Sequence, residues 1–243
     1  MEAGLSRKQA WACALLLAGF AVITADVLAS GPLTRLDWAT HLFVQQQLQH
    51  AWWWWLASIV KHGGNEWILV PLLGALCVFA AVRYRTVRPL LVVFFVCGAI
   101  AVVIPGLKII TGRTAPHTGV DWVFTSGTEF PSGHALNAIV ILGTFLELAA
   151  AISRSVERRL PPRRRYLIIV VAAAAGGLGM LALDYHWLTD VLAGWLLGAA
   201  GYIALLAWDP FRPLREARDE NLRAAAVEDL RRPEAGNSPR EIR

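Results

Sequence analysis

Charged residues are scarce in this sequence, and cysteine is scarcer still. Only 17% of the 243 residues are charged, whereas 56% are hydrophobic and the mean hydropathy is +0.48. This composition argues against a soluble domain and indicates a membrane protein with several spans. The three cysteines, Cys13, Cys77 and Cys97, all lie within apolar runs, so no disulfide framework is expected.

Six long apolar segments dominate the chain. They occupy residues 11–28, 67–82, 89–107, 135–152, 166–183 and 187–208. Each is close to the ~20 residues that a helix needs to cross the ~30 Å hydrocarbon core of a bilayer. The first resembles a signal peptide, but it is long and lacks a small-x-small cleavage site, so we expect an uncleaved span. We therefore predict an all-α polytopic membrane protein with six transmembrane helices in a bundle.

Basic residues are concentrated on one side of this topology. Nineteen of the 23 lysines and arginines fall in residues 1–10, 83–88, 153–165 and 209–243. The positive-inside rule then places both termini in the cytoplasm, with the protein in the cytoplasmic membrane. The net charge of +5 is explained by topology and contact with anionic lipid, so we expect the bilayer as a partner and no nucleic acid.

Two segments outside the spans have their own character. Residues 31–64 combine loosely helical apolar spacing with tryptophans at 52–55, which predicts an interfacial helix anchored on the outer leaflet. The alternative is that this element shapes a lipid entrance. Residues 209–243 contain eight arginines, eight acidic residues and four prolines, which indicates a largely disordered cytoplasmic tail with a short helix around 215–230. The expected organisation is a membrane domain at 1–208, with a motif-bearing core at 89–208, followed by this tail.

The residues Pro131, Ser132, Gly133 and His134 precede the fourth span and suit an anion. Proline fixes how the chain enters the helix, and the next two residues carry backbone N–H groups that have no partner within it. These groups and the helix dipole favour phosphate. Ser132 adds a hydroxyl donor, Gly133 leaves room against the backbone, and His134 can transfer a proton near neutral pH. Taken alone, the same residues also suit an ordinary helix cap with a surface histidine.

His186 and Asp190 form a second candidate pair. Because they are four residues apart, they share one face of a helix. Asp190 can accept from one ring nitrogen and leave the other as a base or nucleophile. The structural alternative is an interfacial pair that steadies the last hairpin. No third ligand lies at a recognisable spacing, so no metal site is predicted.

The predicted topology places these groups on the same outer side. Lys108 and Arg113 follow the third span, the Pro-Ser-Gly-His segment precedes the fourth, and the His186–Asp190 pair opens the sixth. Three hairpins therefore deliver cations and imidazoles to one level of the membrane. This agreement favours catalysis on a phosphate over two unrelated structural features.

These motifs resemble the type-2 phosphatidic-acid phosphatase superfamily, which includes membrane lipid phosphatases and has a site similar to that of vanadium haloperoxidases. The family pattern is Lys-x6-Arg-Pro, Pro-Ser-Gly-His and Ser-Arg-x5-His-x3-Asp, and the resemblance spans residues 89–208. It implies that His186 attacks phosphorus to form a phosphohistidine and that Asp190 orients it. His134 would protonate the leaving group. Lys108, Ser132 and the Gly133 amide would hold the phosphoryl oxygens, with no metal or other cofactor.

The sequence departs from this pattern at two arginines. Ala115 stands at the arginine of the first motif, and Gly179 and Met180 stand at the serine and arginine of the third. Arg113 is expected to take over one of the two phosphate-binding roles. Losing such a cation weakens the stabilisation of developing charge, which affects turnover and substrate choice more than the fold.

The resemblance implies an integral-membrane, metal-independent phosphatase acting on a lipid phosphate or pyrophosphate at the outer face of the membrane. The candidate substrates are polyprenyl phosphates or pyrophosphates, phosphatidic acid and phosphatidylglycerol phosphate. One alternative is phosphotransfer to a lipid or sugar acceptor. The other, suggested by Ala115 and Met180, is a degenerate scaffold that binds or transports a lipid headgroup without cleaving it.

Overall fold

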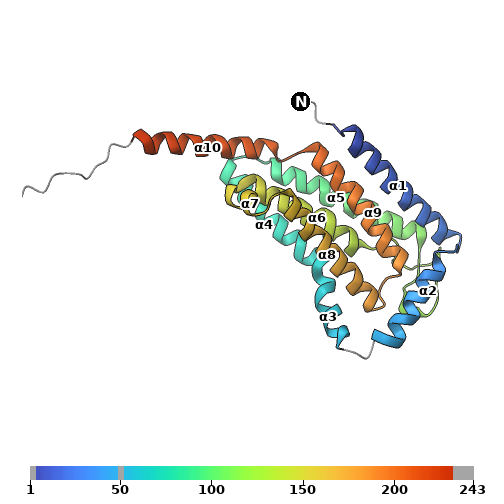
Figure 1. The fold of residues 1–243 in the computed structure, drawn as a ribbon. Coiled ribbons are helices and arrows are strands. Elements are labelled where there is room, and N and C mark those ends of the chain that lie inside the picture. The colour runs from blue at the N-terminus through green and yellow to red at the C-terminus, as the bar shows by residue number, and fades with distance from the viewer. Residues whose placement is uncertain (1–3, 49–51, 232–243) are drawn as a thin grey trace, which may run out of the picture.

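The structure is a computed structural model that describes residues 4–48 and 52–231 of the chain. Within these residues it is all-helical and has no strand (Figure 1). Six helices are long and apolar enough to span a membrane, which confirms the predicted fold class. They are α1 (Arg7–Leu28), α4 (Glu66–Tyr84), α5 (Arg88–Thr111), α6 (Gly133–Ile152), α8 (Pro162–Ala182) and α9 (Leu188–Trp208).

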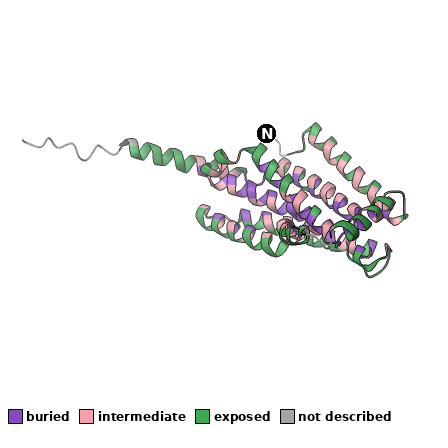
Figure 2. Cartoon of the chain, turned by 60° about the horizontal axis from the view of Figure 1, so that its bottom comes forward, coloured by how far each residue is buried: buried purple, intermediate pink, exposed green. Residues whose placement is uncertain are grey.

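Helix α6 forms the centre of the bundle. Fourteen of its twenty residues are buried, because it packs against α4, α8 and α9 at once. Helix α1 lies outside α9 and buries little more than Val27. Figure 2 shows the buried residues concentrated along the inner helices, while the outer faces are exposed. For a chain of this hydropathy, those exposed apolar faces are the surfaces that lipid covers.

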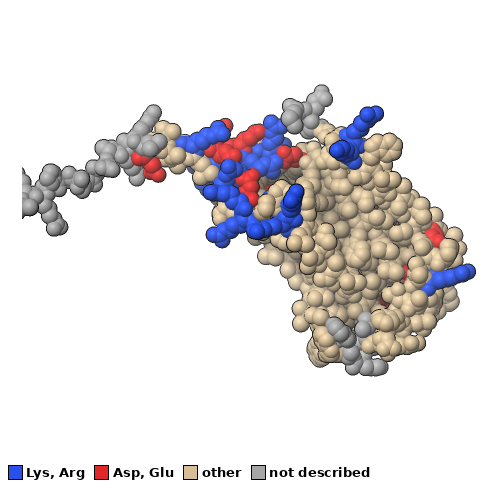
Figure 3. All heavy atoms as spheres, viewed as in Figure 1, with Lys and Arg blue, Asp and Glu red and all other residues tan. Residues whose placement is uncertain are grey.

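Charge is separated between the two ends of the bundle. Figure 3 shows lysine and arginine side chains gathered, with acidic ones, at the end that carries α7 (Arg154–Arg159) and α10 (Arg212–Arg231). The turns before α6 and α9 lie at the other end, because successive spans alternate in direction. The predicted orientation in the membrane depends on this concentration of basic residues at one end of the bundle.

The long connection after α1 is helical, as predicted. It contains α2 (Thr34–Phe43), a π-helical segment η1 (Val44–Leu48), α3 (Trp53–Val60) and the 3-10 segment η2 (Lys61–Gly64). Trp54 and Trp55 are exposed on α3, which suits the anchor that we predict for them. Helix α2 differs from a simple surface helix, because one of its faces is polar and buried.

The tail contains the helix that we predict around residues 215–230. Helix α10 covers twenty residues of the tail, so the described part is more ordered than we expected, and residues 232–243 lie outside the described part. Its beginning is fixed to the bundle, since Phe211 and Leu214 are buried in a core cluster with α4 and α6. The buried Arg218 also donates to the Ala150 carbonyl at 2.7 Å. These contacts hold the start of α10 against the bundle, which the charged composition of the tail did not indicate.

Glycines allow α9 to approach the start of α6. A Cβ atom added at Gly194 would lie 2.5 Å from the Ser132 carbonyl oxygen, and one at Gly198 would lie 3.2 Å from the Leu136 Cα. Neither neighbour is a flexible side-chain end. The absence of a side chain at Gly194 therefore sets how closely α9 meets the Pro-Ser-Gly-His segment.

We predict that Gly194→Ala lowers the thermal unfolding midpoint in detergent, with a cost of about 1–3 kcal/mol for overpacking. The matched control is Gly98→Ala on α5, where no described atom lies within 4 Å of the added Cβ. That variant should be neutral or slightly more stable, because alanine favours a helix over glycine. Equal midpoints for both variants would contradict the close α6–α9 contact.

Candidate active site

A cavity of about 670 Å³ opens where α4 and α6 begin and α5 ends. Its polar lining residues are Glu66, Lys108, His117, Glu129, His134, Asn137 and His186. Gly133 also lines it, at the first turn of α6. An apolar wall continues from this polar end along α5, through Ile104, Ala101 and Ile100. The cavity therefore joins a cationic, imidazole-bearing end to a surface that suits a hydrocarbon chain.

The start of α6 has the geometry that the sequence predicts. Ser132 is the N-cap, and its hydroxyl accepts from the Ala135 amide at 3.4 Å. Its own amide donates to the Asp190 carbonyl at 2.9 Å, which ties the start of α6 to the first turn of α9. Ser132 is fully buried and, among the described residues, is not part of the cavity lining. Its hydroxyl thus shapes the helix start, whereas Gly133 and His134 are the residues of this segment that line the cavity.

His186 lies in the turn between α8 and α9 and is held through one ring nitrogen. Its Nδ1 is 3.4 Å from Asp190 Oδ2 and 3.3 Å from Glu129 Oε2. The Asp190 carboxylate also accepts from the Trp187 amide at 3.0 Å. Two carboxylates at Nδ1 favour a proton on that nitrogen and leave Nε2 as the lone-pair nitrogen. The predicted His186–Asp190 pairing is present, and Glu129 is a second partner that the sequence did not single out.

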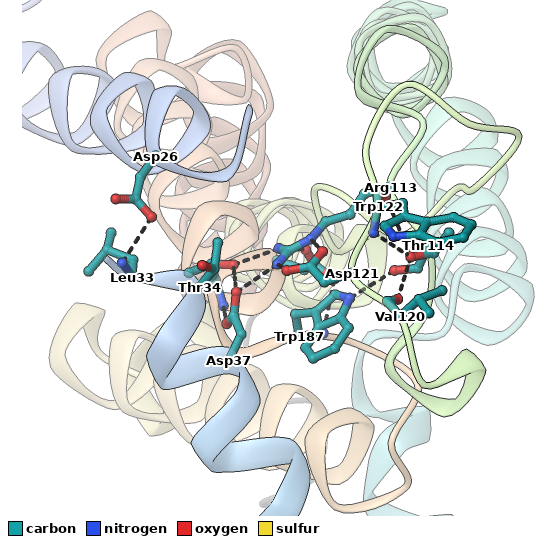
Figure 4. A network of polar contacts seen from close by, with 12 residues as sticks. Asp26, Leu33, Thr34, Asp37, Arg113, Thr114, Val120, Asp121, Trp122 and Trp187 are labelled. Carbon is teal, nitrogen blue, oxygen red and sulfur yellow. Dashed lines mark hydrogen bonds and ion pairs between the residues drawn. The ribbon is translucent and has the colours of Figure 1, made fainter. Parts of the chain in front are cut away.

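Arg113 does not reach this cavity, contrary to our expectation. It is fully buried, and all five of its N–H donors are used (Figure 4). They reach Asp121 through Nε and Nη2 at 2.8 and 2.7 Å, Asp37 through Nη2 at 2.7 Å, and Asp190 and Thr189 through Nη1 at 2.7 Å each. The guanidinium also lies 5.3 Å from the centre of the Trp187 ring. No donor is left for a phosphoryl oxygen. Arg113 instead holds Asp190 and Thr189 in place, outside the cavity.

Asp37 is the buried partner that comes from α2. Its Oδ1 accepts from the Thr189 amide at 2.8 Å, and its Oδ2 accepts from the Thr189 hydroxyl at 2.6 Å. Burial raises the pKa of the Asp37 carboxyl above its ordinary value, while the Arg113 charge and the Thr189 hydrogen bonds oppose that shift. The carboxylate is thus held in a place that water does not reach, by donors from two other elements.

The two departures from the motif pattern occupy different places. Met180 is nearly buried and lines the cavity, whereas Ala115 is buried and, in the described structure, is not part of the lining. His117, two residues after Ala115, does line it. In the described structure, Lys108 is the only lysine or arginine of the lining, beside the three histidines.

Several residues of the site escaped sequence analysis, among them Asp37, His117 and Glu129. Asp37 is 76 residues from Arg113 in the chain, whereas His117, in the 3-10 segment η3 (Pro116–Thr118), and Glu129 lie in the loop between α5 and α6. A signal existed only for Asp37, as an acidic residue beside Trp38 in an otherwise interfacial helix. The loop residues had no periodicity that could place them.

Comparison with known proteins gives a family and a fold. The sequence model of the PAP2 superfamily matches residues 86–213. A similar solved structure is described as the first transmembrane PAP2 type phosphatidylglycerolphosphate phosphatase from Bacillus subtilis. It is 21% identical, with a TM-score of 0.66, over 87% of this chain and 98% of the other. The comparison with curated proteins found no match.

The different surroundings of the two cations lead to a prediction. Arg113→Ala should lower the free energy of unfolding by about 3–5 kcal/mol, because it leaves buried carboxylates without their counter-charge. Lys108→Ala removes a partly exposed cation from the cavity and should change it by no more than about 0.5 kcal/mol. Denaturation of both variants in the same detergent is the measurement. A stable Arg113→Ala protein would show that the buried network does not hold the bundle.

Proposed function

This chain belongs to the PAP2 superfamily, and from that premise we propose that it hydrolyses a lipid phosphate or pyrophosphate through a phosphohistidine at His186. The observation that carries the proposal is the cavity itself. It presents His186, His134 and Lys108 at one end and an apolar wall at the other. A phosphorylated lipid is the ligand whose two parts match these two surfaces.

In the proposed first step, His186 Nε2 attacks phosphorus. The N–P bond forms as the bond to the leaving oxygen breaks, and His134 gives its proton to that oxygen. The imidazole ring of His186 gains positive charge during this attack. The carboxylates of Asp190 and Glu129, which face Nδ1, stabilise that charge.

In the second step water replaces the enzyme nitrogen. His134, now neutral, takes a proton from water as the water oxygen attacks phosphorus, and the N–P bond breaks. The products are inorganic phosphate and the dephosphorylated lipid, or its monophosphate when the substrate is a pyrophosphate. The residues thus complete hydrolysis with one nucleophile and one proton carrier.

The phosphoryl oxygens have fewer cationic partners than the family pattern supplies. Lys108 and the Gly133 amide at the positive end of α6 are the proposed ligands. Ser132 contributes by shaping this helix start, and His117 is the additional group that can donate from the cavity wall. A lysine does not replace the bidentate grip of an arginine, so we expect modest turnover.

Several lipids fit this description, and phosphatidylglycerol phosphate is the first to test. The solved B. subtilis relative is described as a phosphatase of that lipid. Phosphatidic acid and polyprenyl phosphates or pyrophosphates share the same combination of phosphate and hydrocarbon. The charge separation between the two ends of the bundle supports a site on the outer face of the cytoplasmic membrane.

A second candidate function is binding or transport of a lipid headgroup without cleavage. It is favoured by one observation, that Met180 lines the cavity where the family has an arginine while Arg113 is turned away. Such a protein would bind vanadate or phosphate but would release no phosphate from lipid.

The proposal predicts release of inorganic phosphate from these lipids by the purified protein in detergent, with EDTA present. His186→Ala should lower the rate by at least about 10³-fold, because the nucleophile is lost. The control is His62→Ala, since His62 is exposed and, among the described residues, lies outside the cavity lining. Full activity of His186→Ala would exclude the phosphohistidine route.

The missing cation leads to a second prediction for this site. Met180→Arg should raise kcat/KM by about 10- to 100-fold, because a guanidinium in the cavity can stabilise the developing charge. Met180→Leu keeps the volume and apolar character and should leave the rate unchanged. If the arginine variant folds but gains nothing, the cavity works without a second strong cation.

A further inference from the structure

Helix α2 contacts the hairpin that carries His186 but not the cavity. Among the described residues, the cavity lining includes none from α2. One face of the helix is exposed and apolar, with Leu36, Leu42 and Phe43. The opposite face carries Asp37 and His41, both buried and four residues apart. A surface helix that buries two ionisable side chains is making specific contacts with them.

The first contact joins Asp37 to the beginning of α9. Thr189 is the second residue of α9, where a backbone N–H has no acceptor within the helix. Asp37 accepts from that N–H and from the Thr189 hydroxyl, as an N-cap side chain does, although it comes from another helix. Its negative charge also lies at the positive end of the α9 dipole.

The same carboxylate acts on Asp190 through Arg113. Asp37 accepts from Arg113 Nη2 at 2.7 Å (Figure 4), and Asp190 accepts from the other terminal nitrogen, Nη1, at 2.7 Å. Asp190 is in turn the residue beside His186 Nδ1. Asp37 therefore shares the arginine with Asp190, and two residues, Arg113 and Asp190, link it to the imidazole.

The second contact holds the other side of the turn. His41 Nδ1 lies 2.8 Å from Asp184 Oδ1, and the Gln45 side-chain amide donates to Asp184 Oδ2 at 3.0 Å. Asp184 has a φ of +60°, a left-handed conformation that side chains other than glycine adopt with difficulty. Between the two contacts, Trp38 packs on Trp187 with ring centres 5.2 Å apart. Helix α2 thus contacts the turn on both sides of His186, at Asp184 before it and at Trp187 after it.

We propose that Asp37 and His41 are positioning residues and that α2 is a clamp that fixes the His186 turn for attack on phosphorus. This inference rests on the proposed function. In-line attack needs Nε2 in one place, and a displacement of about 1 Å can cost about 10²-fold in rate. The turn is irregular and includes a left-handed residue, so its conformation depends on contacts from outside.

Asp37 also affects the charge of the groups around His186. One guanidinium faces three carboxylates, those of Asp37, Asp121 and Asp190. Because Asp37 and Asp121 offset the arginine, the charge of Asp190 remains available to the imidazole, which becomes positive during attack. Without Asp37, Arg113 would neutralise Asp190 more completely. Its loss should therefore slow the chemical step as well as loosen the turn.

The experiment compares Asp37→Ala, His41→Phe and Thr40→Ala with the wild type. His41→Phe keeps a ring beside Trp38 and Trp187 but removes the bond to Asp184. Thr40 is the control on the same helix, because within the described part of the chain its hydroxyl bonds only its own helix, at the Leu36 carbonyl. Steady-state kinetics of phosphate release are measured per folded protein, and hydrogen exchange is measured over residues 183–190.

The clamp predicts a loss in kcat with little change in KM. Asp37→Ala should lower kcat by about 10- to 100-fold and His41→Phe by about 3- to 10-fold, while Thr40→Ala stays at the wild-type rate. Hydrogen exchange in residues 183–190 should be faster in the first two variants only. A kcat per folded protein within about twofold of the wild type, or unchanged exchange, would overturn the clamp.

Two further outcomes keep this inference separate from the proposed function. If the wild type releases no phosphate from any lipid, the proposed function fails, and the exchange measurement still decides whether α2 holds the turn. If Asp37→Ala does not fold, His41→Phe decides instead. A rise in KM with unchanged kcat would place α2 in substrate binding and contradict a positioning role.

Discussion

The structure depends on one buried guanidinium. Arg113 lies two residues after the end of α5. Its N–H groups donate to Asp37 of α2, to Asp121 of the loop that follows α5, and to Asp190 of α9. Three elements that are distant in the chain therefore meet at a single planar group. A buried arginine with unfilled donors would be costly, so the three acidic residues and Arg113 require one another. That requirement holds these three elements together at the end of the bundle where the cavity opens.

Under the proposed function, the same arrangement leaves the site with a reduced set of phosphate ligands. The arginine nearest to the first motif is committed to structure, and Met180 leaves the cavity wall apolar at another place. What remains is a lysine, a helix N-terminus and three histidines around the cavity. The side chain of His186, the proposed nucleophile, is held by Glu129 and Asp190 at its Nδ1, whereas few cations surround the proposed position of the anion.

The sequence predicted the spans, their number and the helix start at Ser132, because hydrophobic length and cap chemistry are local properties. It also predicted that Lys108, His134 and His186 would meet, because alternating spans bring three hairpins to one level. It did not predict the direction of Arg113. Counting along the chain placed Arg113 beside a family position, but the direction of its side chain depends on Asp37, which lies two complete spans earlier in the chain. The sequence predicted a short helix in the tail but not its packing on the bundle, since Phe211 and Leu214 pack against helices far earlier in the chain.

The shape of the cavity has a consequence for what happens after the reaction. Its polar end and its apolar wall along α5 meet different surroundings, one aqueous and one hydrocarbon. In the proposed hydrolysis, the anion can escape into water while the alcohol slips back between lipid tails, so the two products part without crossing each other's path. The reverse reaction would require phosphate from the water and alcohol from the bilayer to enter the cavity together. The partition of the two products between water and lipid therefore favours hydrolysis over its reversal.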